Sequence, residues 1–172
     1  MSLKKITLKD GLQVILSEYT SDDFDKVVDL FGSLSPEALR WGTPPYTREV
    51  IERWMQEIKN KIVLVAHFQN KIIGYCMIHG SSRPQYKGIR DFMIYIHQDF
   101  QNKGLGSTMT SMAVKLAKDE GLHRIELEVV TDNKIAVHIY EKTGFKIEGL
   151  MKDTFFGDDG KYLDMLVMGL LL

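Results

Sequence analysis

The sequence has one cysteine, Cys76, and no long uninterrupted run of apolar residues. A single cysteine excludes an intramolecular disulfide and a cysteine-rich zinc site. Cys76 lies in the apolar segment Ile72–Ile78, where a buried, unreactive thiol is expected. No apolar run approaches the roughly 20 residues that a membrane helix needs, so no membrane partner is expected. Met1–Lys5 is not followed by a hydrophobic signal core, and a cytoplasmic location is therefore expected.

An excess of charge of one sign is also lacking. Lys and Arg number 22 against 23 Asp and Glu, so no overall field favours nucleic acid as a partner. The five histidines show no metal-ligand spacing, and no metal is expected. The sequence has no repeat, linker or low-complexity segment. With 172 residues and 44% hydrophobic content, residues 1–172 are expected to fold as a single domain with a sizeable core.

Apolar periodicity divides the chain into helices and strands. Asp10-Gly11 is a tight-turn signal, which predicts a short hairpin or a turn into a strand over residues 12–18. Helical spacing follows at 24–31 and 47–58, on either side of an irregular stretch at Pro44-Pro45. The later expected elements are strands at 62–68, 72–78 and 89–96, a helix at 108–120, a strand at 124–130, a helix ending at 143 and a closing hairpin over 145–170. This order predicts the α/β class, with a mixed sheet of about six to seven strands, one parallel crossover and flanking helices.

A glycine-rich turn joins the strand that ends at Ile96 to the next helix. It contains Gln101-Asn102-Lys103-Gly104-Leu105-Gly106-Ser107. The first N–H groups of such a helix have no intrahelical acceptor and carry the positive end of the helix dipole, so they can bind a phosphate. A Walker loop would need a lysine before Ser107-Thr108, and a dinucleotide fingerprint would need glycine at Met109. Neither motif fits, and on this turn alone a purely structural strand-to-helix connection stays open.

A second motif narrows these alternatives. The segment Glu126–Phe145, together with the glycine-rich turn, resembles the GCN5-related N-acetyltransferases, the GNAT superfamily. The resemblance covers residues 62–170. The tail, from Ile147-Glu148-Gly149 to Met165, is similar to bacterial branches that acetylate amino acids, polyamines and ribosomal proteins. The resemblance implies the GNAT fold, acetyl-CoA as the cofactor and a cofactor core at about residues 62–145.

The resemblance also implies which residues hold acetyl-CoA. The Asn102–Ser107 amides would bind its pyrophosphate, and the backbone of Ile94–Ile96 would pair with the pantetheine arm and donate to the thioester oxygen. Asn133 matches a position that hydrogen-bonds this arm, although a plain N-cap would need no ligand. Many relatives have proline where this chain has Gln98. The predicted cofactor-binding residues are Ile94, Tyr95, Ile96, Gln101, Asn102, Lys103, Gly104, Leu105, Gly106, Ser107, Asn133 and Tyr140.

Three residues are candidates for catalysis. An amine with a pKa near 10.4 is mostly protonated at pH 7, so a base helps to produce the neutral nucleophile. Glu128 is the first candidate base, on the polar face of its strand, and Asp91 is the second; a solvated strand carboxylate is the alternative for Glu128. Tyr140 matches the general-acid position of the family, where a protonated phenol can donate to the departing sulfur. Its alternative is aromatic packing at a helix end.

These observations predict an acetyl-CoA-dependent N-acetyltransferase that transfers acetyl directly to a small-molecule or peptide amine in a ternary complex. Amino acids, polyamines and protein N-termini all stay open as acceptors, and a non-catalytic acyl-CoA-binding sensor is the alternative function. Specificity is expected to depend on the helices before residue 62 and on the loop at 80–88. Residues considered for the acceptor pocket are Trp41, Tyr46, Trp54, His79, His97 and Tyr162. A homodimer through the last hairpin is a further expectation.

Overall fold

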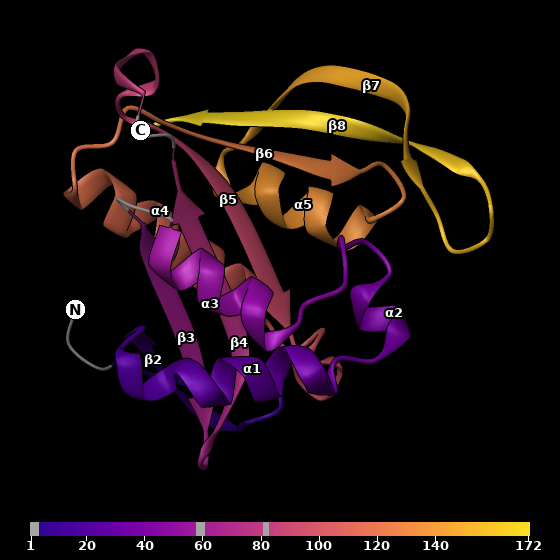
Figure 1. Ribbon diagram of the computed structural model, residues 1–172. Coiled ribbons are helices and arrows are strands. Elements are labelled where there is room, and N and C mark those ends of the chain that lie inside the picture. The colour runs from indigo at the N-terminus through magenta and orange to yellow at the C-terminus, as the bar shows by residue number, and fades with distance from the viewer. Residues whose placement is uncertain (1–3, 58–60, 81–82) are drawn as a thin grey trace.

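Figure 1 shows the computed structural model of the chain, which describes residues 4–57, 61–80 and 83–172. Ile58, where the predicted third helix ends, lies outside the described residues, as do residues 81–82 of the predicted loop at 80–88. The elements in chain order are β1 (Lys4–Thr7), β2 (Gln13–Glu18), η1 (Ser21–Asp23), α1 (Phe24–Ser33), α2 (Pro36–Leu39), α3 (Arg48–Glu57), β3 (Ile62–Phe68), β4 (Lys71–His79), η2 (Pro84–Tyr86), β5 (Ile89–Ile96), η3 (Gln98–Phe100), α4 (Leu105–Asp119), β6 (Arg124–Val130), α5 (Lys134–Thr143), β7 (Lys146–Phe156) and β8 (Tyr162–Leu171).

The eight described strands form one sheet in the order β1-β2-β3-β4-β5-β6-β8-β7. Among these strands β5 and β6 pair in parallel, and the other neighbours pair antiparallel. The predicted mixed α/β fold is confirmed, but the sheet exceeds the six to seven strands expected. The additional strand is β1, because the chain on both sides of Asp10-Gly11 pairs as a hairpin, the first of the two alternatives expected there.

Helices cover both faces of the sheet because its strands send alternate side chains to opposite sides. α4 and α5 cover one face, where a core includes Phe92, Met109 and Phe145. α1 and α3 cover the other face, where a second core includes Phe31 and Tyr75. Figure 1 shows α1 and α3 in front of the sheet and α5 behind its other face. The sheet therefore separates two cores, each with its own pair of helices.

Strands β5 and β6 separate soon after they begin. Their parallel pairing is limited to Ile89 with Arg124, Arg90 with Ile125 and Asp91 with Glu126. Beyond this point β5 continues to pair with β4 as far as Ile96, while β6 continues to pair with β8. The rest of β5 therefore has a strand neighbour on one side and an open backbone edge on the other. No helix of the described chain is long and apolar enough to cross a membrane.

Helix α4 begins at Leu105, three residues before the predicted start at Thr108. The N-cap of α4 is Gly104, with a φ of 87°. The Gly104 carbonyl accepts the first helical hydrogen bond, from the Thr108 N–H at 3.1 Å. A residue with a side chain is strained at this φ, whereas glycine is not. The glycine therefore lets the chain turn directly from an extended segment into a helix.

Candidate active site

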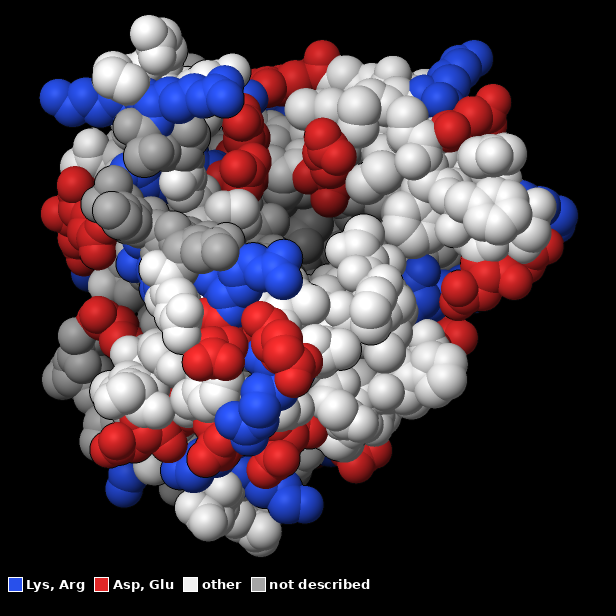
Figure 2. Space-filling view, viewed as in Figure 1, with Lys and Arg blue, Asp and Glu red and all other residues white. Residues whose placement is uncertain are grey.

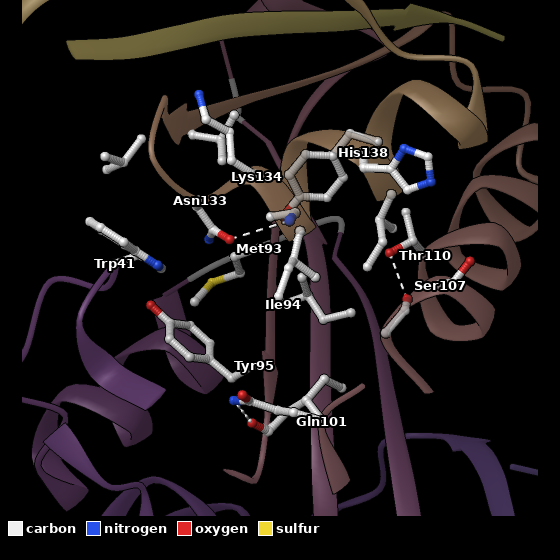
Figure 3. A pocket seen from close by; sticks show the side chains of 18 of the residues that line it. Trp41, Met93, Ile94, Tyr95, Gln101, Ser107, Thr110, Asn133, Lys134 and His138 are labelled. Carbon is white, nitrogen blue, oxygen red and sulfur yellow. Dashed lines mark hydrogen bonds between the residues drawn. The ribbon is translucent and has the colours of Figure 1, made fainter. Parts of the chain in front are cut away.

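A cavity of about 760 Å³ lies where β5 and β6 separate. Its walls come from β5, β6, the glycine-rich turn, the first turns of α4, one side of α5 and the segment around α2 (Figure 3). Figure 2 shows basic and acidic side chains interspersed over the face seen in Figure 1, without a continuous patch of one sign. The volume is within the range of about 300–1,000 Å³ typical of ligand pockets. It can hold an elongated ligand that passes between the strands.

The open edge of β5 forms the middle of the cavity. Residues Phe92–Ile96 all line it. Ile94 and Ile96 pack on the core beneath α4 and α5, and Met93 and Tyr95 pack on the core beneath α1 and α3. The Gln101 side-chain amide donates to the Ile96 carbonyl at 3.0 Å, which fixes the end of the strand. An extended ligand can therefore pair with this backbone edge as an added strand would.

The glycine-rich turn presents free backbone amides to the cavity. Asn102 has a φ of 59° and Gly104 a φ of 87°, and a turn of this kind makes a concave array of N–H groups that suits an anion. No side chain caps α4 at Gly104. By helix geometry the N–H groups of Leu105, Gly106 and Ser107 are then left without an intrahelical acceptor. Three amides and the positive end of a 15-residue helix are available to a phosphate.

The N-terminus of α5 differs, because its own sequence caps it. The Asn133 side chain accepts a hydrogen bond from the Ala136 N–H at 3.2 Å. Asn133 also lines the cavity, where Figure 3 shows it close to Met93 and Ile94. Its side-chain oxygen is engaged in the cap, so its amide N–H groups are what it can offer to a ligand. The N-cap role and the predicted cofactor contact are compatible.

The turn after β5 is also joined to the first helices. The Gln98 side chain accepts from the Ser35 N–H at 3.1 Å and donates to the Ser33 carbonyl at 3.0 Å. A proline in place of Gln98 could make neither bond. Gln98 therefore connects the turn after β5 to the segment between α1 and α2.

Tyr140 lies on α5 and packs against Phe92 and Phe145, with each pair of ring centroids 5.8 Å apart. It is 8% exposed, and it lines the cavity. No described buried side-chain oxygen or nitrogen lacks a hydrogen-bond partner, so the unbonded Tyr140 hydroxyl must reach the open space. Burial raises the pKa of Tyr140 well above its usual value, which keeps the phenol protonated. The aromatic packing is compatible with the acid role, which stays a prediction.

The two candidate bases lie in different places. Glu128 is exposed and lines the cavity, on the face of β6 opposite to the buried Leu127. Asp91 is aligned with His79 on β4 and with Glu126 on β6, and it does not line the cavity. Burial raises the pKa of Asp91, with a smaller contribution from Glu126, while His79 opposes the shift. Of the two, Glu128 is the carboxylate placed to meet a ligand.

Two other predicted cofactor residues also lie outside the cavity lining. The Lys103 ammonium is 2.8 Å from an Asp10 carboxylate oxygen, and it lies over the Phe100 ring. The Leu105 side chain is 1% exposed and belongs to the core. Leu105 can therefore contribute its backbone N–H alone, and the charge of Lys103 is neutralised by Asp10. Local sequence does not reveal the environment of Lys103, because it depends on how the N-terminal hairpin packs.

Side chains enclose the cavity on the α1–α2 side. Tyr46 and Tyr95 share a hydrogen bond through their hydroxyl groups, and the Thr43 N–H donates to the Tyr46 hydroxyl at 2.6 Å. A Cβ at Gly42 would lie 2.7 Å from the Tyr46 hydroxyl, so a larger residue here would displace that hydroxyl. Trp41 belongs to the same turn and lines the cavity, and Figure 3 shows it on the same side of β5 as Tyr95. Ser107, Thr110 and His138 lie on the opposite side.

Of the acceptor candidates only Trp41 lines the cavity; Tyr46 contacts it through Tyr95. Trp54 packs in the core against Phe31, with ring centroids 5.8 Å apart. Tyr162 is 64% exposed on the last hairpin. His79 and His97 also lie outside the lining, as do the described residues of the loop at 80–88. Within the described chain, no group of three or more His, Cys, Asp or Glu could hold a metal ion.

Lys9 also lines the cavity, although no motif in the sequence predicted it as a site residue. It precedes the Asp10-Gly11 turn, and its stem lies over Gly104. Its position in a turn could be predicted, but not the loop that this turn contacts. Only the tertiary structure reveals this contact, because Lys9 and Gly104 are far apart in the sequence.

Comparison with known proteins gives a consistent result. The sequence profile of the Acetyltransferase (GNAT) family matches residues 25–145. L-amino acid N-acetyltransferase AaaT of Escherichia coli is 33% identical over 107 residues, 61% of this chain and 65% of that protein. The chain thus spans less than two thirds of the first curated relatives that it matches.

Solved structures extend the likeness to most of the chain. The acetyltransferase of the GNAT family from Streptococcus pneumoniae has a TM-score of 0.81 and 28% identity, covering 92% of this chain and 99% of that one. Spermidine N-acetyltransferase from Vibrio cholerae, solved in complex with CoA and spermine, has a TM-score of 0.75 and 23% identity, covering 92% and 95%. At 23% identity, the similarity to the Vibrio cholerae enzyme shows a shared fold only.

Proposed function

The chain belongs to the GNAT acetyltransferase family, and from this premise we propose that it is an acetyl-CoA-dependent N-acetyltransferase acting on an amine. The observation that carries the proposal is the cavity itself. An uncapped helix N-terminus, an open strand edge and the hydroxyl of the largely buried Tyr140 meet in one space between β5 and β6. These groups supply an anion site, a backbone partner for an amide-bearing arm and a proton donor.

The cofactor side is the α4–α5 face of the sheet. The amides of Leu105, Gly106 and Ser107 would bind the pyrophosphate, since anions are stabilised at helix N-termini. The pantetheine arm carries amide groups that can pair with the edge of β5, and Asn133 can donate to it from the other wall. Bound acetyl-CoA supplies a thioester carbonyl for attack and a thiolate leaving group.

The acceptor side is the α1–α2 face, where Trp41, Tyr95 and Glu128 line the cavity. Glu128, directly or through a water, would take the proton that the attacking amine must lose. Tyr140 would donate its phenolic proton to the leaving sulfur as the C–S bond breaks and the new N–C bond forms. A backbone N–H of β5 could stabilise the charge that develops on the carbonyl oxygen. The transfer is direct, because no cysteine lies in either motif and Cys76 is fully buried.

The acceptor is proposed as a small-molecule or peptide amine. The family relatives named above act on L-amino acids and on spermidine, and the cavity does not by itself choose between such amines. Two carboxylates, Glu37 and Glu128, line its acceptor side, and these can attract an ammonium group before it is deprotonated.

The test is turnover with a library of amines. The full chain is incubated with acetyl-CoA and amino acids, polyamines or peptides with free N-termini, and free CoA thiol and acetylated product are measured together. Release of CoA in step with an acetylated amine supports the enzyme. Tight CoA binding without release from any acceptor supports the alternative, a non-catalytic acyl-CoA-binding sensor on the same fold.

We also propose that two copies associate through the β7–β8 hairpin. This hairpin carries exposed apolar side chains at Ile147, Leu150, Phe156 and Tyr162, each at least 50% exposed. The ring centroids of Phe156 and Tyr162 lie 5.1 Å apart, and contiguous exposed apolar side chains are typical of interaction surfaces. Light scattering should report a dimer for the native chain and a monomer for Leu150→Lys; a native monomer would contradict the proposal.

A further inference from the structure

The turn between β1 and β2 packs directly on the glycine-rich turn. The Lys9 N–H donates to the Lys103 carbonyl at 3.0 Å, and an Asp10 carboxylate oxygen is 2.8 Å from the Lys103 ammonium. The hairpin turn is closed by a bond from the Leu8 N–H to the Leu12 carbonyl at 2.8 Å. Leu8 is 5% exposed and belongs to the core. The hairpin is therefore fixed in position by both its own core residue and its contacts with Lys103.

This contact places the Lys9 side chain over the start of α4. Its Cγ and Cε atoms each lie 3.6 Å from the point where a Cβ on Gly104 would stand. Its side chain also lines the cavity. In the described part of the chain the Lys9 ammonium has no carboxylate partner, whereas the neighbouring Lys103 is paired with Asp10. Of the two lysines at this turn, Lys9 is the one whose charge is available to a ligand.

A cation beside free amides is suited to an anion of more than one negative charge. The amides of Leu105, Gly106 and Ser107 give directional hydrogen bonds, and an ammonium adds a charge that helix amides alone do not provide. Lys103 was predicted to take part in this site through its backbone amide, and its ammonium is paired with Asp10 of the N-terminal hairpin. The Asp10–Lys103 ion pair thus holds the hairpin turn that carries Lys9, and Lys9 supplies the free positive charge.

We propose that Lys9 is a phosphate-binding residue that contacts the pyrophosphate of acetyl-CoA, held there by the Asp10–Lys103 ion pair. The inference rests on the proposed function, because it requires the cavity to bind acetyl-CoA. It assigns a role in the cofactor site to the N-terminal hairpin, which lies outside the motifs that predicted the site. The pyrophosphate is favoured over the 3′-phosphate because Lys9 lies over Gly104, next to the amides that face the same anion.

The experiment compares four forms of the full chain by calorimetry: the native protein, Lys9→Met, Lys9→Arg and Lys5→Met. Lys5 is an exposed lysine on the same hairpin, and it does not line the cavity. Lys5→Met therefore removes the same charge at a position away from the cavity. Lys9→Met should weaken CoA binding by about three- to tenfold, as expected for one partly exposed charge-assisted contact. Lys9→Arg should recover most of the affinity, and Lys5→Met should match the native protein.

Two truncated ligands make the result specific. With 3′-dephospho-CoA, which keeps the pyrophosphate, Lys9→Met should lower the binding affinity by the same factor as with CoA. With acetylpantetheine, which has no phosphate, the kcat/KM of Lys9→Met and the native protein should agree. Equal CoA affinity for Lys9→Met and Lys5→Met would overturn the inference, as would a loss that disappears with 3′-dephospho-CoA or that persists with acetylpantetheine. Failure of the native protein to bind CoA would instead contradict the proposed function.

Discussion

The proposed cofactor side and the proposed acceptor side of the cavity are built from different parts of the chain. On the α4–α5 face the main groups are backbone: three amides at the start of α4 and the open edge of β5. On the α1–α2 face they are side chains, with Trp41 and the Tyr46–Tyr95 pair supported by an irregular segment. Backbone groups depend on chain conformation, so the first side tolerates much sequence change. The second side can change with each side chain, which suits a family whose acceptors differ.

The largest expected effect comes from Gly104→Val. A β-branched residue is strained at a φ of 87°, so the turn should rearrange and the α4 amides should no longer converge on one anion. We expect calorimetry to show CoA affinity reduced by about 10³-fold or more, since several charge-assisted hydrogen bonds are lost together.

Gly121→Val is the matched control for this variant. Gly121 also has a positive φ, of 72°, and it lies at the other end of α4, where a Cβ would have no neighbouring atom within 4 Å. It should lose stability but keep its CoA affinity. Normal CoA binding by a folded Gly104→Val protein would show that the turn is purely structural.

Tyr140→Phe tests the group that lies between the two sides. The ring packing against Phe92 and Phe145 is preserved, but the proton donor is removed. We expect kcat to fall by about 10²-fold while CoA affinity changes little, because general-acid catalysis typically contributes this much or more. Steady-state kinetics with a verified acceptor provides the measurement. A kcat equal to that of the native enzyme would exclude Tyr140 from the mechanism.

Trp41→Ala should affect the acceptor alone. Trp41 lines the cavity on the α1–α2 side, and truncation would remove an aromatic wall without touching the α4 amides. A change of about tenfold in the acceptor KM, with CoA affinity unchanged, is expected from the loss of one aromatic contact. If instead CoA affinity falls and the acceptor KM stays constant, the division between the two sides is wrong.

The smallest expected effect is on stability in acid. Burial lowers the pKa of both His67 and His79, which lie toward the α1–α3 face. Protonation therefore favours the unfolded chain, so the stabilisation present above about pH 6.5 is lost as the pH falls below that value. Denaturant unfolding should show a loss on the order of 1 kcal/mol between pH 7 and 5, reduced in the His67→Gln, His79→Gln double variant. An unchanged slope in that variant would assign the loss to other groups.

The sequence predicted the backbone-built side better than the side-chain-built side, for a physical reason. Gly104 and Gly106 act through local conformation, which a short motif specifies, and the alternation around Leu127 specifies a strand. The roles of Lys103 and Lys9 depend on a contact between segments far apart in sequence. Periodicity carries no information about such a contact.

On the acceptor side, too, the sequence does not predict contacts between distant segments. Tyr95 was predicted to pair with the pantetheine arm through its backbone, which stays a prediction; that its side chain bonds to Tyr46 could not be seen in the sequence. Asp91 has the residue type of a base, yet its register with Glu126 places it in the paired part of the two strands, before they separate. The residue types were visible in the sequence, whereas the point at which β5 and β6 separate was not.

The most direct test of the central claim is to follow backbone amides by nuclear magnetic resonance as CoA is added to the native protein. The N-terminus of α4 is open and that of α5 is capped by Asn133. The amide signals of Leu105, Gly106 and Ser107 should therefore show the largest downfield shifts at saturation, because these groups gain an anionic acceptor. Saturation with CoA while these three signals stay unchanged would contradict the claim that the uncapped helix binds the cofactor.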